Sequence, residues 1–322
     1  MSESLPGASA HIAAALQLCA TIDDLPADTQ LLPVARVGVI GAGTMGAEIA
    51  QAIAAAEIPV VLADLDGERV ARGLAQARHV TERQLAQLVE KGRLDASEAA
   101  ARADALAGRI AGTTGYAGFG DVDLVIEAVP ERMADKQAVF AELDAATPGH
   151  AILASNTSCL SITEMADVTG RPDKVVGIHF FFPASSSRLV EIVEGQDTSP
   201  ETLQAAANFA QKIRKTPIQC AEDPGFVVNR ILTAGMSELW RQQEESGLDA
   251  EALDRAVTES GAAPIGPFLL TDLLGLDTVL HVAEHLRESY GERFHVHAGM
   301  QELVAAGDLG KKTGKGFYEH GS

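Results

Sequence analysis

Hydrophobic and polar positions follow two different patterns along the chain. Up to about residue 220, short apolar runs alternate with stretches at helical spacing, which is typical of an α/β sheet. Seven runs predict strands, within residues 37–40, 59–63, 119–130, 151–158, 174–182, 189–193 and 216–220. Helices are expected at residues 45–56, 68–90, 96–107 and 202–213. The first part of the chain is therefore predicted to be an α/β domain over residues 34–220.

Beyond residue 220 the strand signals fade. Apolar residues at helical spacing continue through residues 227–246, 249–260, 267–287 and 300–306. We therefore predict an all-helical C-terminal domain over residues 221–322. Residues 1–33 form an N-terminal extension, in which the apolar stretch His11–Ala20 predicts a helix that packs on the body or on a partner subunit.

The first apolar run leads into a glycine turn that opens a helix. Gly41, Gly43 and Gly46 fit the spacing G-x-G-x-x-G. The first permits a tight turn, the second lets the backbone approach a pyrophosphate, and the third lets the helix pack against the strand. The N-terminus of that helix would bind the phosphates. The loop residues expected to contact a dinucleotide are Gly41, Ala42, Gly43, Thr44, Met45 and Gly46.

A second strand ends in an acidic residue that strengthens this interpretation. Three glycines alone could form an ordinary turn, but Asp64 follows Gly46 by eighteen residues and ends the next apolar run. A carboxylate there can accept hydrogen bonds from a ribose 2′-hydroxyl. Because Leu65 follows it and the nearest basic residue is Arg69, the sequence favours NAD over NADP. The fold expected is a Rossmann-type doubly wound sheet.

Composition narrows the possible partners. The 322 residues include 46% hydrophobic and 22% charged ones, an ordinary globular balance, and the formal charge is −20. That charge disfavours nucleic acid and anionic membranes, so a polyanionic ligand needs local basic residues. No apolar run reaches the roughly eighteen residues of a membrane span, and the chain begins acidic rather than with a basic leader.

The three cysteines give no framework for a disulfide or a metal site. Cys19, Cys159 and Cys220 are odd in number and widely spaced. This usage fits a reducing compartment, so we expect a cytoplasmic protein that holds no metal.

The ordered motifs resemble the L-3-hydroxyacyl-CoA dehydrogenase family, either free-standing or as the dehydrogenase part of multifunctional enzymes of fatty-acid and lipid metabolism. The likeness spans residues 35–318. It rests on the glycine loop and on residues 127–131 (EAVPE), 155–158 (SNTS), 179–183 (HFFFP), 189–191 (LVE), 223–230 (DPGFVVNR), 266–268 (GPF) and 310–318 (GKKTGKGFY). It implies an NAD-dependent oxidation of L-3-hydroxyacyl-CoA to 3-oxoacyl-CoA, in a homodimer paired through the helical domain.

The chemistry of the candidate residues agrees with that activity. Oxidising a secondary alcohol requires a base for the hydroxyl proton while hydride leaves the carbon, and a histidine, with its pKa near 6.5, suits this task. A lone histidine on an apolar strand is commonly a core residue, but the resemblance makes His179 the base. Glu191, on the next strand, would fix its tautomer.

The resemblance also assigns roles to residues further along the chain. Ser158 would bind the substrate oxygen, and Asn229 would hold the thioester side and help to set the dyad. Either residue alone could instead cap a turn or helix. The family positions near the cofactor are Glu127, Arg132, Ser158 and Lys312. Arg132 stands where asparagine is common, and Lys312 could be a solvated lysine.

Three departures from the family pattern leave two other functions open. Phe182 replaces a polar residue near the nicotinamide ribose, and Ala77 and Gln84 replace a serine and a lysine that contact CoA in some relatives. One alternative is a dehydrogenase of CoA-free 3-hydroxy acids, similar to L-gulonate dehydrogenase and lambda-crystallin. The adjacent serine and cysteine at Ser158 and Cys159 resemble the sequence of that group. The other is a non-catalytic NAD-binding protein.

Overall fold

The computed structural model describes Thr29 and residues 31–321. The chain divides into two compact units, with the boundary along the sequence between Glu222 and Asp223. The helix expected at His11–Ala20 lies outside the described residues. Within the described part of the chain, no helix combines the length and the apolar character needed to cross a membrane.

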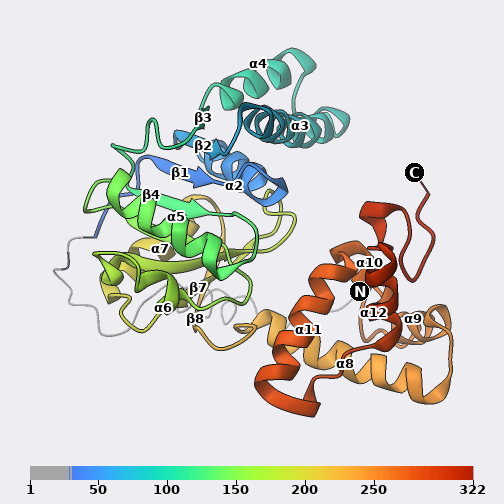
Figure 1. Cartoon of the computed structure of the whole chain (residues 1–322). Helices are drawn as coiled ribbons and strands as arrows, with labels where there is room; N and C mark the ends of the chain where they lie inside the picture. The colour runs from blue at the N-terminus through green and yellow to red at the C-terminus, as the bar shows by residue number, and fades with distance from the viewer. Residues whose placement is uncertain (1–28, 30, 322) are drawn as a thin grey trace, which may run out of the picture. The chain divides into compact units, whose positions relative to one another are not determined.

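The first unit is built on an eight-stranded sheet in the order β3-β2-β1-β4-β5-β6-β7-β8 (Figure 1). Its strands are β1 (Val37–Ile40), β2 (Val60–Asp64), β3 (Ile110–Thr114), β4 (Leu124–Glu127), β5 (Ile152–Ser155), β6 (Val175–Phe180), β7 (Leu189–Glu194) and β8 (Thr216–Ala221). All neighbours are parallel except β6 and β7, which are antiparallel. The predicted Rossmann-type doubly wound sheet is confirmed.

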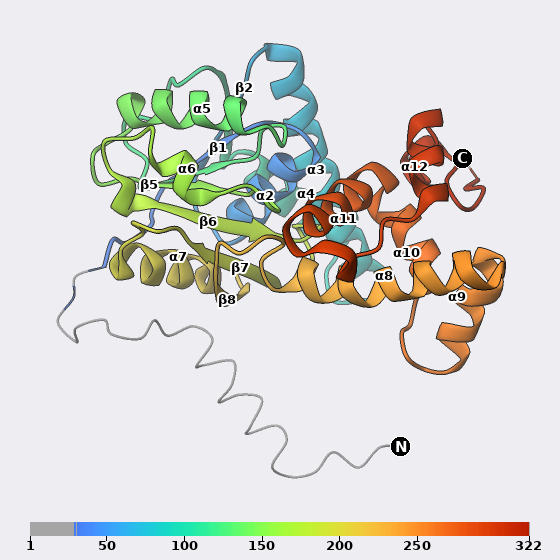
Figure 2. The same cartoon turned by 60° about the horizontal axis from the view of Figure 1, so that its bottom comes forward.

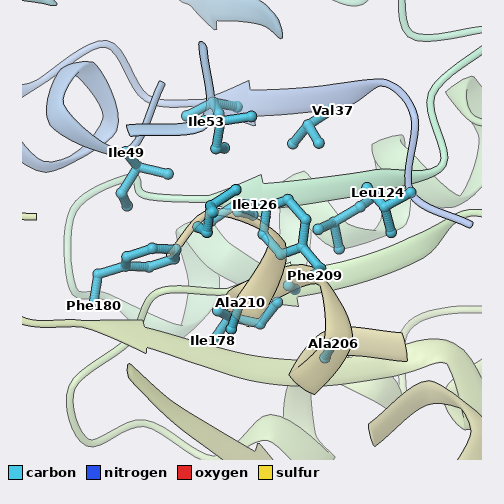
Figure 3. Close-up of a cluster of buried hydrophobic side chains, with 14 of the residues drawn as sticks. Val37, Ile49, Ile53, Leu124, Ile126, Ile178, Phe180, Ala206, Phe209 and Ala210 are labelled. Carbon is cyan, nitrogen blue, oxygen red and sulfur yellow. The ribbon is translucent and has the colours of Figure 1, made fainter. Parts of the chain in front are cut away.

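Helices cover both faces of the sheet. They are α2 (Thr44–Ala55), α3 (Gly67–Glu90), α4 (Ala96–Ala107), α5 (Met133–Ala146), α6 (Ile162–Ala166) and α7 (Pro200–Lys212). Figure 2 shows α5 and α6 on one side of the sheet and α7 on the other. Ile49 and Ile53 of α2 and Phe209 of α7 pack with Ile126 and Ile178 of the sheet in one buried cluster (Figure 3). This cluster fixes the strands whose ends form the site.

One strand and two α-helices of the first unit were not predicted from the sequence. They are β3, α5 and α6. β3 is an edge strand paired only with β2, and most of its residues are exposed, so it lacks the apolar alternation that reveals a strand. In α5, buried residues include the charged Lys136 beside Phe140 and Leu143, which interrupts the apolar stripe expected of such a helix.

Helix α7 ends in a left-handed turn at an arginine. The φ of Arg214 is 62°. Its N–H donates to the Gln211 carbonyl at 2.8 Å, and the Lys215 N–H donates to the Ala210 carbonyl at 2.8 Å. This closing motif usually uses glycine, because a side chain in left-handed backbone costs on the order of 1–2 kcal/mol. The chain retains an arginine at a position where glycine would be more stable.

The second unit is helical, as predicted. Its helices are α8 (Val228–Ser246), α9 (Ala250–Glu259), α10 (Pro267–Leu274), α11 (Leu276–Tyr290) and α12 (Ala298–Ala306). Trp240, Phe268 and Met300 are fully buried in its core. The stretch 267–287, expected as one helical segment, is two helices, because Gly275 has a φ of 96° and interrupts the helical backbone.

Candidate active site

The glycine loop between β1 and α2 leaves no room for side chains at two of its three glycines. Gly41 has a φ of 98°, and a Cβ there would lie 2.5 Å from the Ala128 carbonyl oxygen. A Cβ at Gly46 would lie 1.7 Å from the Gly41 carbonyl oxygen. Gly43 differs, because a Cβ there meets nothing within 4 Å. The loop is thus tightly folded around an open position where a ligand can approach the backbone.

The N-terminus of α2 opens at this position. Gly43 is the N-cap and supplies no side-chain hydrogen bond, and the first turn holds no acidic residue. Gly43 and Thr44 are exposed, and Met45 is half-buried. The first N–H groups of a helix have no partner within it, so they and the helix dipole favour a bound phosphate. The backbone of this loop fits a dinucleotide pyrophosphate.

Asp64 is oriented by the same loop. Its carboxylate accepts hydrogen bonds from the Ala42 N–H at 2.8 Å and the Leu65 N–H at 2.7 Å. The Arg69 guanidinium lies 3.7 Å from Asp64 and 3.2 Å from Asp66, so it already faces two carboxylates. A ribose 2′-phosphate would meet the negative charge of Asp64 here. These residues fit the ribose of NAD.

His179 and Glu191 come together because their strands pair in register. They are directly opposite each other in the antiparallel pair β6 and β7. His179 Nδ1 lies 2.7 Å from Glu191 Oε2, and both side chains are buried. Ile178 and Phe180, the neighbours of His179, point into the cluster of Figure 3, so alternation along the strand turns His179 to the opposite face. The two side chains thus form a hydrogen bond, and their role as a catalytic pair stays a prediction.

Ser158 lies in a loop after β5 that is held by Glu131. One oxygen of this carboxylate accepts the Ser158 N–H at 2.8 Å, the Ser158 hydroxyl at 3.3 Å and the Thr157 hydroxyl at 2.5 Å. Asn156 in the same loop accepts the Phe180 N–H at 2.9 Å through Oδ1. The loop is therefore fastened both to Glu131 and to the strand that contains His179.

Glu127 does not reach solvent. Its carboxylate is fully buried at the end of β4 and accepts from Lys136 Nζ at 2.8 and 3.0 Å, from the Ser155 hydroxyl at 2.6 Å and from the Val129 N–H at 2.6 Å. The sequence assigned Glu127 to the cofactor crevice. In the structure its carboxylate is instead enclosed by Lys136, Ser155 and the Val129 N–H.

Lys136 is a residue that sequence reasoning missed. It is only 1% exposed, and its ammonium lies between Glu127 and Glu131, 3.2 Å from the second. Burial raises the pKa of Glu131, but Lys136 and the hydrogen bonds from the loop outweigh burial and lower the pKa overall. Glu131 therefore stays charged and keeps its hold on Ser158. The helical spacing of Lys136 with Phe140 and Leu143 was the available signal.

The remaining candidate residues are Arg132, Asn229 and Lys312. Arg132 caps the start of α5, is exposed and pairs with Asp135 at 2.5 Å. Asn229 and Lys312 belong to the helical unit, where Asn229 is half-buried near the start of α8 and Lys312 pairs with Asp277. Among the candidates of the first unit, the structure joins His179 to Glu191, and it fastens the loop of Ser158 to Glu131 and to β6.

Sequence profiles of both domains of one family match the chain. The profile of the 3-hydroxyacyl-CoA dehydrogenase NAD-binding domain covers residues 36–223, and that of its C-terminal domain covers residues 225–320. The chain belongs to the 3-hydroxyacyl-CoA dehydrogenase family. It is an NAD-dependent dehydrogenase, in agreement with the glycine loop and Asp64.

Similar proteins extend over almost the whole chain. It is 39% identical over 287 residues to a probable 3-hydroxybutyryl-CoA dehydrogenase of Deinococcus radiodurans, which covers 88% of this chain and 100% of the relative. It is 38% identical to a 3-hydroxybutyryl-CoA dehydrogenase of Clostridioides difficile, covering 88% and 99%. The crystal structure of (S)-3-hydroxybutyryl-CoA dehydrogenase from Ralstonia eutropha matches with a TM-score of 0.80 and 37% identity, covering 90% and 100%.

Proposed function

We propose that this protein oxidises an L-3-hydroxyacyl-CoA to the 3-oxoacyl-CoA, with the buried pair His179 and Glu191 as the catalytic base. The observation that supports it most is the 2.7 Å contact between them. The relatives in Deinococcus radiodurans and Clostridioides difficile are named for a substrate of this class. The three cysteines are widely separated in the sequence and suggest no disulfide framework, which supports a cytoplasmic location.

In this mechanism His179 removes the hydroxyl proton of the substrate. Because Nδ1 faces Glu191, the neutral ring donates that N–H to the carboxylate, and Nε2 is the nitrogen that accepts the proton. Glu191 then stabilises the imidazolium. Bound NAD would supply the acceptor for the hydride that leaves the carbon bearing this hydroxyl group. Ser158 binds the substrate oxygen, and Asn229 binds the thioester side.

A panel of substrates tests the proposed class. We expect NADH formation with 3-hydroxybutyryl-CoA and with a longer 3-hydroxyacyl-CoA, at rates far above those with free 3-hydroxy acids. The measurement is absorbance of NADH under matched concentrations of each compound. Turnover of the free acids alone would reject the CoA substrate and favour the second function.

That second function, oxidation of a CoA-free 3-hydroxy acid, has one structural observation in its favour. Ala77 is 1% exposed. Gln84 is occupied by hydrogen bonds with Gln51 and with the Ser185 carbonyl. Neither residue offers the serine or lysine that contacts CoA in some relatives, so a CoA substrate needs contacts from other residues. The intact dyad argues against a non-catalytic protein.

We further propose a symmetric homodimer formed through the helical unit. Of the leucines suggested by the sequence, Leu276 and Leu280 are buried in the core. Three on α10 are more than a third exposed: Leu269, Leu273 and Leu274. These three side chains give α10 a partly exposed apolar surface, which supports its burial against a second copy.

Light scattering across a dilution series tests the dimer. We expect a mass of twice 33.7 kDa at micromolar concentration, and half of that for Leu269→Asp/Leu273→Asp. The control is Leu65→Asp, which introduces the same charge at another exposed leucine, in the first unit, and should leave the mass unchanged. An active wild-type protein with a mass near 33.7 kDa would reject the dimer.

A further inference from the structure

A polar recess lies in the first unit beside the loop that joins β6 to β7. Its volume is about 220 Å³. The walls come from α2 near Gln51, from the serines at 185–187 and from residues 213–215 after α7. The loop is fixed from two sides, since Gln84 Nε2 donates to the Ser185 carbonyl at 3.3 Å and Lys215 Nζ donates to the Ser187 carbonyl at 2.6 Å. The recess is thus built from secured backbone.

Two arginines border this recess. Arg188 and Arg214 are both exposed, and neither side chain forms a hydrogen bond or ion pair with the described residues. Lys215 is buried and contributes a third positive charge, although its ammonium is committed to the carbonyls of Ala184 and Ser187. Glu48 is the carboxylate on the facing side, and it accepts from the Ser185 N–H and hydroxyl. In a chain of charge −20, such a gathering of unpaired cations favours an anion.

The backbone at Arg214 is an independent observation. This residue closes α7 in the left-handed conformation, with a φ of 62°, where glycine is favoured. An exposed side chain at such a position adds no packing that would offset the strain. Strain of this kind commonly persists at functional sites. The position therefore points to a use for the guanidinium.

We propose that this recess binds the phosphate groups of the CoA part of the substrate, through Arg188 and Arg214. This inference rests on the proposed function. Guanidinium groups bind phosphate through paired, charge-assisted hydrogen bonds. The two arginines supply the local basic residues that a polyanionic substrate requires, and they replace the contacts that Ala77 and Gln84 do not make.

The position of the recess indicates that it binds the substrate rather than the cofactor. The pyrophosphate of NAD is assigned to the N-terminus of α2 at Thr44, whereas the recess lies beside Gln51 and Ala55. At a rise of about 1.5 Å per residue, Gln51 is about 10 Å further along the helix. The loop that forms the recess begins directly after β6, the strand of His179. Because His179 faces away from α2, a long ligand with its reactive end at His179 would reach the recess by passing around the C-terminal end of β6.

Two variants test the proposal. Arg188→Gln removes one guanidinium, and Arg214→Gly removes the other while relieving the left-handed strain. We expect the double variant to raise KM for 3-hydroxybutyryl-CoA and Kd for free CoA by tenfold or more. KM for the N-acetylcysteamine thioester, which has no phosphate, should stay within twofold. Adenosine 3′,5′-bisphosphate should inhibit wild type competitively and the variant only weakly.

Two controls separate binding from folding and from general charge. The melting temperature of Arg214→Gly should not fall, because glycine suits that backbone. Arg255→Gln removes the same charge from an exposed helix of the second unit and should leave both KM values unchanged. Unchanged Kd for CoA in the double variant, or equal rises of KM for both thioesters, would overturn the proposal. If the wild-type protein binds CoA but oxidises only free acids, the proposed function fails. The Kd for free CoA, measured by calorimetry in wild type and in the double variant, still tests the recess.

Discussion

Replacing His179 with alanine is expected to lower kcat by at least a hundredfold. A positioned general base contributes roughly 10²–10⁴ in rate, and the buried ring is already oriented by Glu191 at 2.7 Å. NAD affinity should barely change, because the glycine loop after β1 and Asp64 at the end of β2, to which the cofactor is assigned, lie on other strands than His179. Steady-state kinetics with 3-hydroxybutyryl-CoA and a fluorescence titration with NADH measure the two quantities.

Two further variants make this result specific to the dyad. Glu191→Gln keeps the shape of the carboxylate but removes its charge, so it should lower kcat by tenfold or more by withdrawing support from the imidazolium. His150→Ala is the matched control, since this histidine is exposed and pairs only weakly with Asp123 at 3.4 Å. Turnover of His179→Ala within a few-fold of wild type would remove His179 from the mechanism.

The parts of the site that the sequence predicts are those encoded by neighbouring residues. The turn at Gly41 and the close approach at Gly46 follow from glycine spacing, and both are present. Asp64 follows from the end of an apolar run. His179 and Glu191 could be assigned to successive strands, but only the register of β6 against β7 shows that they lie opposite each other. Pairing register depends on long-range contacts that the local pattern does not contain.

The sequence did not predict the surroundings of Lys136, Glu127 and Arg214, because these depend on the folded structure and not on the residue type. Lysine is rarely buried, so Lys136 gives no local sign that two carboxylates enclose it. Glu127 was expected at the crevice because it ends a strand, yet its partners Lys136 and Ser155 come from later parts of the chain. Arg214 likewise gives no local sign of its left-handed backbone, which appears only where α7 ends.

Exchanging the residues at the end of β2 is expected to shift cofactor preference towards NADP by about a hundredfold. The variant is Asp64→Asn with Leu65→Arg. Loss of the carboxylate removes charge-assisted hydrogen bonds to the ribose, each worth about 1.5–3 kcal/mol, or tenfold to a hundredfold in affinity. It also removes repulsion of a 2′-phosphate, and the new arginine can bind that phosphate.

The structure determines which substitutions suit this test. Asp64 also accepts the Ala42 N–H at 2.8 Å, so asparagine, which keeps an acceptor oxygen, preserves the glycine loop where alanine would leave that N–H unpaired. Leu65 is 85% exposed, so arginine fits there without disturbing the core. Leu65→Gln is the control for shape without charge and should not favour NADP. The quantity to compare is kcat/KM with NAD and with NADP for each variant, and a wild type that already prefers NADP would show that Asp64 does not select the cofactor.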